Sequence, residues 1–222
     1  MRNGVGTNPN DRLRFKGSAL SPGLTAGILW QPQEQHSLSV VYRSPSSSVF
    51  DGHLTTSVTG LFKRQDATFD AKFPQTIIAG WSYRPTPNWN LEFNLDWADW
   101  DVVNEFTLAT AAGALKTPFN WKSSFIYKFD ATPQMQGWNL SAGYWFAEET
   151  VPDAYFKPIV PDQALHVWSA GGRWMLNKWE MALTYQFGYG PTRNVLGSEG
   201  RMADGAYRWL SHAMTFSAGR RF

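Results

Sequence analysis

The sequence lacks cysteine, long apolar runs and clusters of like charge, and each absence excludes a class of protein or site. Because none of its 222 residues is a cysteine, the chain has no disulfides and no thiolate sites. Cysteine usage therefore does not indicate whether the protein works in an oxidising or a reducing compartment. No stretch approaches the roughly 18 consecutive apolar residues of a membrane helix. The nearest candidate, TLATAAGAL, is short and built from small residues. A helical membrane protein is therefore excluded.

The charged residues are nearly balanced in sign and scattered along the chain. Twenty basic and 18 acidic residues give a net charge of +2. No basic run is present to follow a phosphate backbone, so nucleic acid is not an expected partner. The N-terminal stretch MRNGVGTNPNDR has no basic-then-apolar signal pattern. If the protein is exported, we expect its targeting sequence to lie outside this chain.

Aromatic residues are plentiful, at 16% of the chain, and they recur in alternating segments. In KWEMALTYQFGYG every second side chain from Trp179 to Tyr189 is apolar or aromatic, whereas those from Glu180 to Gly188 are polar or small. The segments NWNLEFNLDW and GWNLSAGYWF follow the same pattern. Alternation of period two is typical of a strand whose two faces meet different surroundings.

This pattern predicts about nine strands, and the connections between them alternate between tight turns and long loops. Tight turns such as QPQEQ and LNK are rich in polar residues, while the long segments lie near residues 45–72, 102–117, 148–163 and 191–207. We therefore expect an all-β, antiparallel, up-and-down meander. Its strands are predicted near residues 22–31, 36–44, 73–84, 88–101, 118–130, 137–147, 164–176, 178–190 and 208–222.

The composition of the two strand faces favours a transmembrane barrel over a soluble sandwich. A sandwich would expose many Lys, Glu and Thr residues on its outer face, but here the non-aromatic face is mostly Gly, Ser, Ala, Asn and Thr, which suits an enclosed polar lumen. The rings also fall at the two ends of the apolar face, as in a membrane aromatic girdle. The predicted girdle residues are Trp30, Trp81, Trp89, Trp138, Trp174 and Trp179 near the tight turns, and Trp97, Trp121, Trp168 and Tyr185 near the long loops.

Four segments carry a resemblance to a known family. They are GLTAGILWQPQEQHSLSVVYRS, FPQTIIAGWSYRPTPNWNLEFNLDWADWDVVNEF, the pair Val151–Asp153 and Pro161–Asp162 within GWNLSAGYWFAEETVPDAYFKPIVPDQALHVWSAGGRW, and the terminal Phe222. From about residue 14 onward the chain resembles the FadL-type long-chain fatty-acid transporters of Gram-negative outer membranes. The resemblance implies a fourteen-stranded barrel with an N-terminal hatch and a lateral opening in its wall.

Compared with the fourteen-stranded barrel of that family, the chain is expected to contain about nine of the strands. Residues 1–21 are interpreted as a polar loop or strand remnant, and residues 22–222 as the C-terminal portion of the barrel, without the hatch and early strands. We expect the chain to be a fragment, because two open edges in lipid leave unpaired backbone groups. Phe222 is interpreted as the aromatic end that the barrel-assembly machinery reads, although Arg220 two places earlier weakens that signal.

Candidate ligand-binding residues are those whose side chains face the predicted lumen. A fatty acid needs an apolar path for its tail and a cation for its carboxylate. The cations are Arg43, Lys122, Lys128 and Arg173, and Lys122 roughly matches a family position where lysine meets the headgroup. Trp100 and Trp145 are predicted to line the tail path or to fill the lumen. These charges could equally form salt bridges that brace the barrel.

No catalytic, metal or cofactor motif is found, since the four His residues are scattered and no nucleophile elbow or zinc motif occurs. The expected function is transport of long-chain fatty acids or similar hydrophobic compounds by passive diffusion through an outer-membrane barrel. The expected partners are the ligand, outer-membrane lipid and the barrel-assembly machinery. Two alternatives stay open: aromatic-hydrocarbon uptake within the same family, and a soluble β-rich protein that binds hydrophobic ligands.

Overall fold

The computed structural model describes residues 12–58, 63–135, 137–158 and 160–220. These residues form fourteen β-strands and three single-turn 3-10 helices, η1 (Trp100–Val102), η2 (Asp153–Tyr155) and η3 (Glu199–Arg201). Every strand pair is antiparallel, so the predicted all-β class is confirmed. None of the helices in the described ranges has the length and apolar character needed to cross a membrane.

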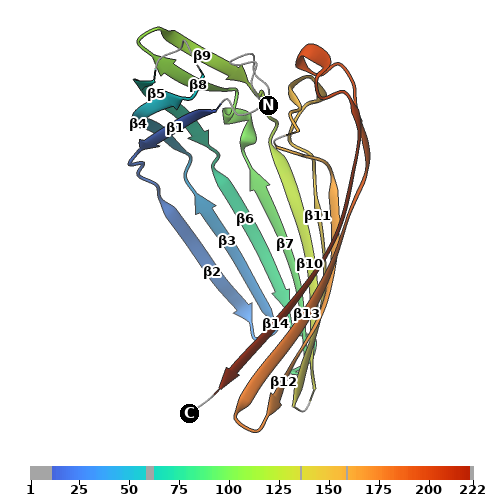
Figure 1. Ribbon diagram of the computed structural model, residues 1–222. Coiled ribbons are helices and arrows are strands. Elements are labelled where there is room, and N and C mark those ends of the chain that lie inside the picture. The colour runs from blue at the N-terminus through green and yellow to red at the C-terminus, as the bar shows by residue number, and fades with distance from the viewer. Residues whose placement is uncertain (1–11, 59–62, 136, 159, 221–222) are drawn as a thin grey trace.

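Nine strands make one curved wall, which is the main body of the molecule (Figure 1). They lie in the order β14-β13-β12-β11-β10-β7-β6-β3-β2, so each strand of the wall pairs with the next wall strand along the chain, as the meander predicts. The tight turns lie at one end of the wall and the long connections at the other. The strands are β2 (Thr25–Gln33), β3 (His36–Arg43), β6 (Thr76–Tyr83), β7 (Trp89–Ala98), β10 (Ser124–Met135), β11 (Trp138–Ala147), β12 (Leu165–Leu176), β13 (Trp179–Val195) and β14 (Gly205–Arg220).

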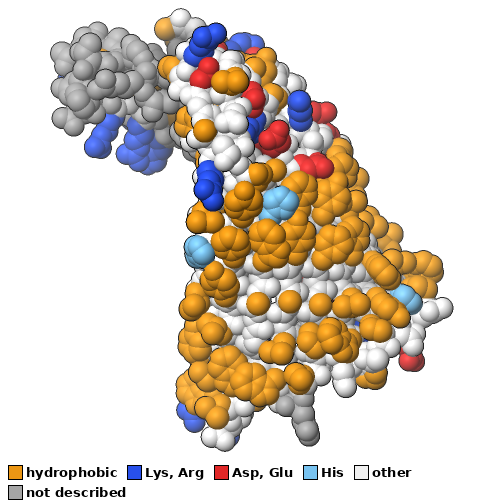
Figure 2. Space-filling model, turned by 90° about the vertical axis from the view of Figure 1, so that its right-hand side faces the viewer, with side chains coloured by type: hydrophobic (Ala, Val, Ile, Leu, Met, Phe, Trp, Pro, Cys, Tyr) orange, Lys and Arg blue, Asp and Glu red, His pale blue; other side chains and the backbone are white. Residues whose placement is uncertain are grey.

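The register of the wall gathers the apolar side chains on one face. Leu183 lies opposite Phe216 on one side and Gly172 on the other, and Tyr185 lies opposite Met214. Many of these side chains are exposed, which is the opposite of a soluble core. Figure 2 shows hydrophobic side chains covering the outside of the wall as a broad band, with charged side chains gathered toward the loop end.

The concave face carries small and polar side chains, and several of the polar ones lie close to glycines of the neighbouring strands. A Cβ atom added to Gly143 would come within 2.4 Å of Asp130 Oδ1 and 2.7 Å of Ser169 Oγ. One added to Gly80 would come within 2.6 Å of Asn94 Oδ1 and of Ser39 Oγ. Glycine is therefore needed at these positions so that polar side chains of neighbouring strands can cover the wall without filling the lumen.

Five strands form a second sheet that the sequence reading missed. The segments expected to be long loops near residues 45–72 and 102–117 contain β4 (Ser46–Thr56), β5 (Arg64–Phe73), β8 (Glu105–Thr110) and β9 (Gly113–Pro118), and β1 (Leu13–Ser18) joins them in the order β1-β4-β5-β8-β9. The described residues thus form fourteen strands where about nine were predicted. These five form a sheet of their own and take no place in the strand order of the wall.

The second sheet sits at the loop end of the wall (Figure 1). Leu54, Ala67 and Ala71 are buried in it. Phe69 makes ring contacts with Phe50 and with Phe106, with centroids 6.2 and 5.4 Å apart. Most of its strands lie in segments that were predicted to be long loops, although β5 does alternate, with Ala67, Phe69, Ala71 and Phe73 separated by polar residues.

The edge strands of the wall are β2 and β14, and among the described residues each pairs with one neighbour only. Unpaired strand edges are costly in hydrocarbon because no water is present to bond the free backbone groups. The division of the chain at residues 21 and 22, and its interpretation as a fragment, stay predictions. Phe222 lies outside the described residues.

Candidate ligand-binding site

Two of the predicted lumen cations are neutralised by carboxylates on neighbouring strands. Lys128 Nζ on β10 lies 2.5 Å from Asp96 Oδ2 on β7. Arg173 on β12 forms an ion pair with Glu180 on β13. Each pair links two adjacent strands, which supports the bracing role considered above for these charges. Trp145 lies directly opposite Lys128 in the register, on the same concave face.

The other two cations, Arg43 and Lys122, are exposed, and neither has an ion pair within the described parts of the chain. Arg43 ends β3 opposite Thr25 and Thr76. Lys122 lies between β9 and β10, where its backbone N–H donates to Thr150 O at 2.8 Å. The structure therefore does not bring the four cations together, and it leaves two of them available to a ligand.

Lys122 lies at the rim of a pocket of about 270 Å³ at the loop end of the wall, lined by Lys122, Glu149, Thr150, Val151, Pro152, Asp153 and Arg193. The Val-Pro-Asp segment that carried the family resemblance thus forms part of the pocket wall. Its backbone is fixed by the second half of that motif, because Asp162 Oδ2 accepts the N–H groups of Thr150 (2.8 Å) and Val151 (2.7 Å).

Arg193 is the residue that joins the two halves of the motif, and sequence reasoning missed it. Its Nη2 donates to Asp153 Oδ1 (2.6 Å) and to Val151 O (2.5 Å), and its Nη1 donates to Asp162 O (2.8 Å). The guanidinium also lies 5.0 Å from the centroid of the Phe156 ring. Only 9% of Arg193 is exposed. Its charge is therefore used inside the protein, unlike that of Lys122.

The position of Arg193 follows from an irregularity of β13. This strand runs to Val195, past the end predicted at residue 190, and its pairing with β14 shifts register between Gly190 and Arg193. The shift carries Arg193 above the wall, beside the connection between β11 and β12. The Gly190-Pro191 pair in the sequence lies where this register shift begins.

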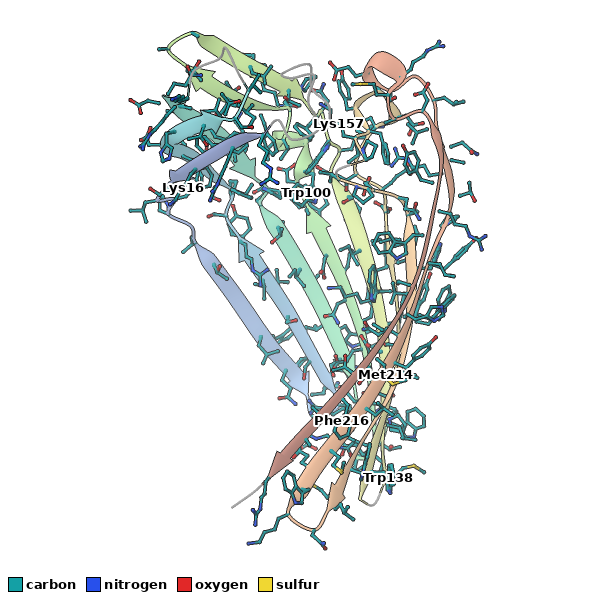
Figure 3. All side chains as sticks on the ribbon, viewed as in Figure 1. Lys16, Trp100, Trp138, Lys157, Met214 and Phe216 are labelled. Carbon is teal, nitrogen blue, oxygen red and sulfur yellow. The ribbon has the colours of Figure 1, made fainter. Side chains whose placement is uncertain are left out.

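An apolar cluster lies behind the pocket. Val151, Phe156, Val195 and Ala203 are buried together, and Trp121 and Tyr207 pack against them. Trp121, expected in the membrane girdle, is thus placed elsewhere, because it precedes β10 and lies outside the strand alternation. Trp100 in η1 contacts Trp121 edge-on at 5.3 Å between centroids, and Figure 3 shows it at the loop end of the wall.

The remaining predicted girdle residues lie on strands of the wall. Trp138 and Trp174 stack with centroids 5.4 Å apart at the tight-turn end, where Figure 3 shows Trp138. At the loop end, Tyr185 Oη lies 2.7 Å from His212 Nδ1. The contact of these rings with lipid headgroups stays a prediction. The exposed girdle residues are Trp30, Trp81, Trp89, Trp138, Trp168, Trp179 and Tyr185, while Trp97 and Trp174 are half-buried.

The arrangement offers one available ammonium group at the mouth of a pocket with aromatic and aliphatic side chains behind it. Such a site suits a molecule with a hydrophobic body and an anionic or polar end. Within the described ranges no group of three or more His, Asp or Glu residues is placed to hold a metal ion.

Comparisons with known proteins agree with this architecture. The long-chain fatty acid transport protein of Escherichia coli O157:H7 is 19% identical over 241 aligned residues, covering 99% of this chain and 51% of that protein. A Pseudomonas aeruginosa FadL homologue has a TM-score of 0.71 at 16% identity, over 91% of this chain and 53% of its own. The Ralstonia pickettii toluene transporter TbuX has a TM-score of 0.63 at 12% identity, over 95% and 50%.

The chain spans about half the length of these relatives. The likeness to the two solved structures shows a shared fold. Family membership rests on the family model described as outer membrane protein transport protein (OMPP1/FadL/TodX), which matches residues 3–212. Because that match covers nearly the whole sequence, the chain belongs to the OMPP1/FadL/TodX family of Gram-negative outer-membrane transport proteins.

Proposed function

We propose that this chain forms part of the wall and the outer mouth of a channel that carries long-chain fatty acids across the outer membrane by passive diffusion. The observation that carries the proposal is the contrast between the two cations of the pocket. Arg193 is held by Asp153, Asp162 and Val151, whereas Lys122 is exposed and has no ion pair among the described residues. Lys122 is therefore the group that would receive a carboxylate.

The apolar cluster and the rings behind the pocket would hold the tail of the ligand. Trp121 and Phe119 lie 5.4 Å apart, and Phe119 in turn contacts Phe106 at 4.6 Å. An aromatic lining also suits a ring-shaped ligand, and one solved relative is a toluene transporter. Aromatic-hydrocarbon uptake is thus the second candidate, and it differs from the first in needing no cation.

Lys122→Met separates these candidates because it keeps the length of the side chain and removes its charge. The chain would be purified in detergent, and oleate and toluene would be titrated against its tryptophan fluorescence. For the fatty-acid function, oleate affinity should fall about tenfold, as expected for the loss of one hydrogen bond to a charged group, and toluene affinity should stay unchanged. Lys116→Met is the matched control, because Lys116 already pairs with Glu105 at 2.7 Å.

Two results would count against the proposal. If oleate binds equally well to wild type and Lys122→Met, then the ammonium group does not receive the carboxylate. If toluene binds and oleate does not, then the second candidate replaces the first. For passive diffusion, uptake into vesicles carrying the protein should follow the oleate gradient and should not respond to collapse of the proton gradient.

A further inference from the structure

Three rings stack on the outside of the wall at its tight-turn end, and the channel function uses none of them. His36 on β3 lies opposite Tyr83 on β6, with centroids 4.7 Å apart and planes 12° from parallel. Trp81 on β6 lies 6.0 Å from His36, with planes 8° apart. These residues share the apolar face with Leu38, which lies opposite Trp81. The stack is thus a built feature of the lipid-facing surface.

The contact between Trp81 and His36 fixes where the imidazole proton lies. Trp81 Nε1 is 3.2 Å from His36 Nδ1. An indole N–H can only donate, so Nδ1 must accept, and in the neutral ring the proton is on Nε2. No contact of Nε2 is seen within the described ranges. His36 therefore presents an oriented, unused N–H donor on the outer surface.

The other outward-facing histidines differ on this point. His166 Nδ1 lies 2.8 Å from Tyr144 Oη, and His212 Nδ1 lies 2.7 Å from Tyr185 Oη. A phenol can donate or accept, so these two contacts leave the imidazole tautomer open. Among the three histidines on this face, only His36 has its free donor set by its partner.

The lipid environment supplies acceptors at this depth. The chain belongs to an outer-membrane family, and the tight-turn end of such barrels faces the periplasm. Stacked Trp and Tyr rings settle at the headgroup level, where glycerophospholipids present phosphodiester oxygens. A cationic residue is anchored at the same place, because the Arg84 N–H donates to Gln35 O at 2.8 Å in the turn next to His36.

We propose that His36, Trp81 and Tyr83 form a headgroup site for a glycerophospholipid of the periplasmic leaflet, in which His36 Nε2–H donates to a phosphate oxygen. The ring stack keeps the donor in place, and the adjoining apolar face packs against the acyl chains. Trp30, which is 61% exposed and lies opposite Leu38, extends that face on β2. The site holds the wall at a fixed depth in the bilayer.

The test uses the full chain, with histidine labelled with ¹⁵N, in bilayer discs of phosphatidylethanolamine. Solid-state NMR measures the dipolar coupling between ¹⁵N of the imidazoles and ³¹P of the lipid. A coupled, protonated Nε2 signal is expected in wild type and should be lost in His36→Phe, which keeps a ring in the stack. Trp81→Phe should weaken the coupling, because it removes the donor that fixes the tautomer. His53→Phe is the control, since His53 lies in the second sheet, 3.3 Å from Arg64.

A second measurement separates binding from folding. Dihexanoyl-phosphatidylethanolamine titrated against the chain in detergent should bind about tenfold more weakly to His36→Phe, while oleate binding by the Lys122 pocket stays unchanged. An equal coupling in wild type and His36→Phe would overturn the proposal. So would the same coupling from inorganic phosphate in lipid-free detergent, because it would show a phosphate contact without lipid.

Discussion

Replacing Arg193 with methionine should release the connection between β11 and β12 while leaving the nine-stranded wall intact. Methionine keeps most of the volume of the side chain but removes its charge and its donors. Val151 O then loses its bond from Nη2, and Asp153 and Asp162 lose their common cation. The connection would then be held by its apolar cluster and by the bonds that Thr150 and Val151 donate to Asp162.

The size of the effect follows from the burial of the partners. Removing one partner of a fully buried ion pair costs roughly 3–5 kcal/mol. Arg193 has only 8% of its side chain exposed, but Asp153 has 45% and Asp162 has 21% exposed, so water can take over part of the lost interaction. The free energy of local opening should therefore fall by about 2–3 kcal/mol. This raises the equilibrium constant for opening, and with it the exchange rate, roughly 30- to 150-fold.

Hydrogen exchange measures this opening directly. The informative amides are those of Thr150 and Val151, because both donate to Asp162 Oδ2. Their exchange should accelerate by that factor in Arg193→Met, whereas amides in the middle of β12 should be unaffected. Arg208→Met, at an exposed position on β14, is the matched control. Unchanged exchange at Thr150 and Val151 in Arg193→Met would refute the reasoning and would assign the connection to apolar packing.

Two further predictions concern the loop end. Gly52→Ala should detach β1 from the second sheet, because the new Cβ would lie 2.1 Å from the backbone oxygen of Lys16. Trypsin should then cleave β1 much faster. Gly219→Ala is the control: it has open space around it and should not change the digestion pattern. The hydroxyl and the backbone N–H of Ser198 both donate to Asp204 and lower the pKa of its carboxyl group. The stability that the ionised Asp204 confers is therefore present above the pKa of the unfolded chain, near 3.9, and is lost as the pH falls through the lower pKa of the folded state. The protection of the β13–β14 connection against hydrogen exchange, taken relative to the intrinsic rate at each pH, should therefore fall in acid. An equal fall in wild type and Asp204→Asn would contradict this assignment.

Local patterns determined the wall and its two faces. The alternation between Trp179 and Tyr189 decides which side chains of β13 face outward, because successive residues of a strand point to opposite sides. The same rule placed all nine wall strands, and the polar turn segments placed the ends where the tight turns lie. These features depend on neighbours in the chain, so the sequence was sufficient to predict them.

The second sheet and the site at the mouth were decided by the tertiary structure. β5 pairs with β8 across two intervening strands of the wall. The alternation of β5 is visible in its sequence, but a local pattern does not say which strand it pairs with. Arg193 reaches Asp153 and Asp162 only because the register of β13 and β14 shifts above Gly190. Trp121 lies outside the strand alternation, partly buried against the apolar cluster of the loops. Such choices depend on contacts between residues far apart in the chain, which a periodic pattern along one strand does not record.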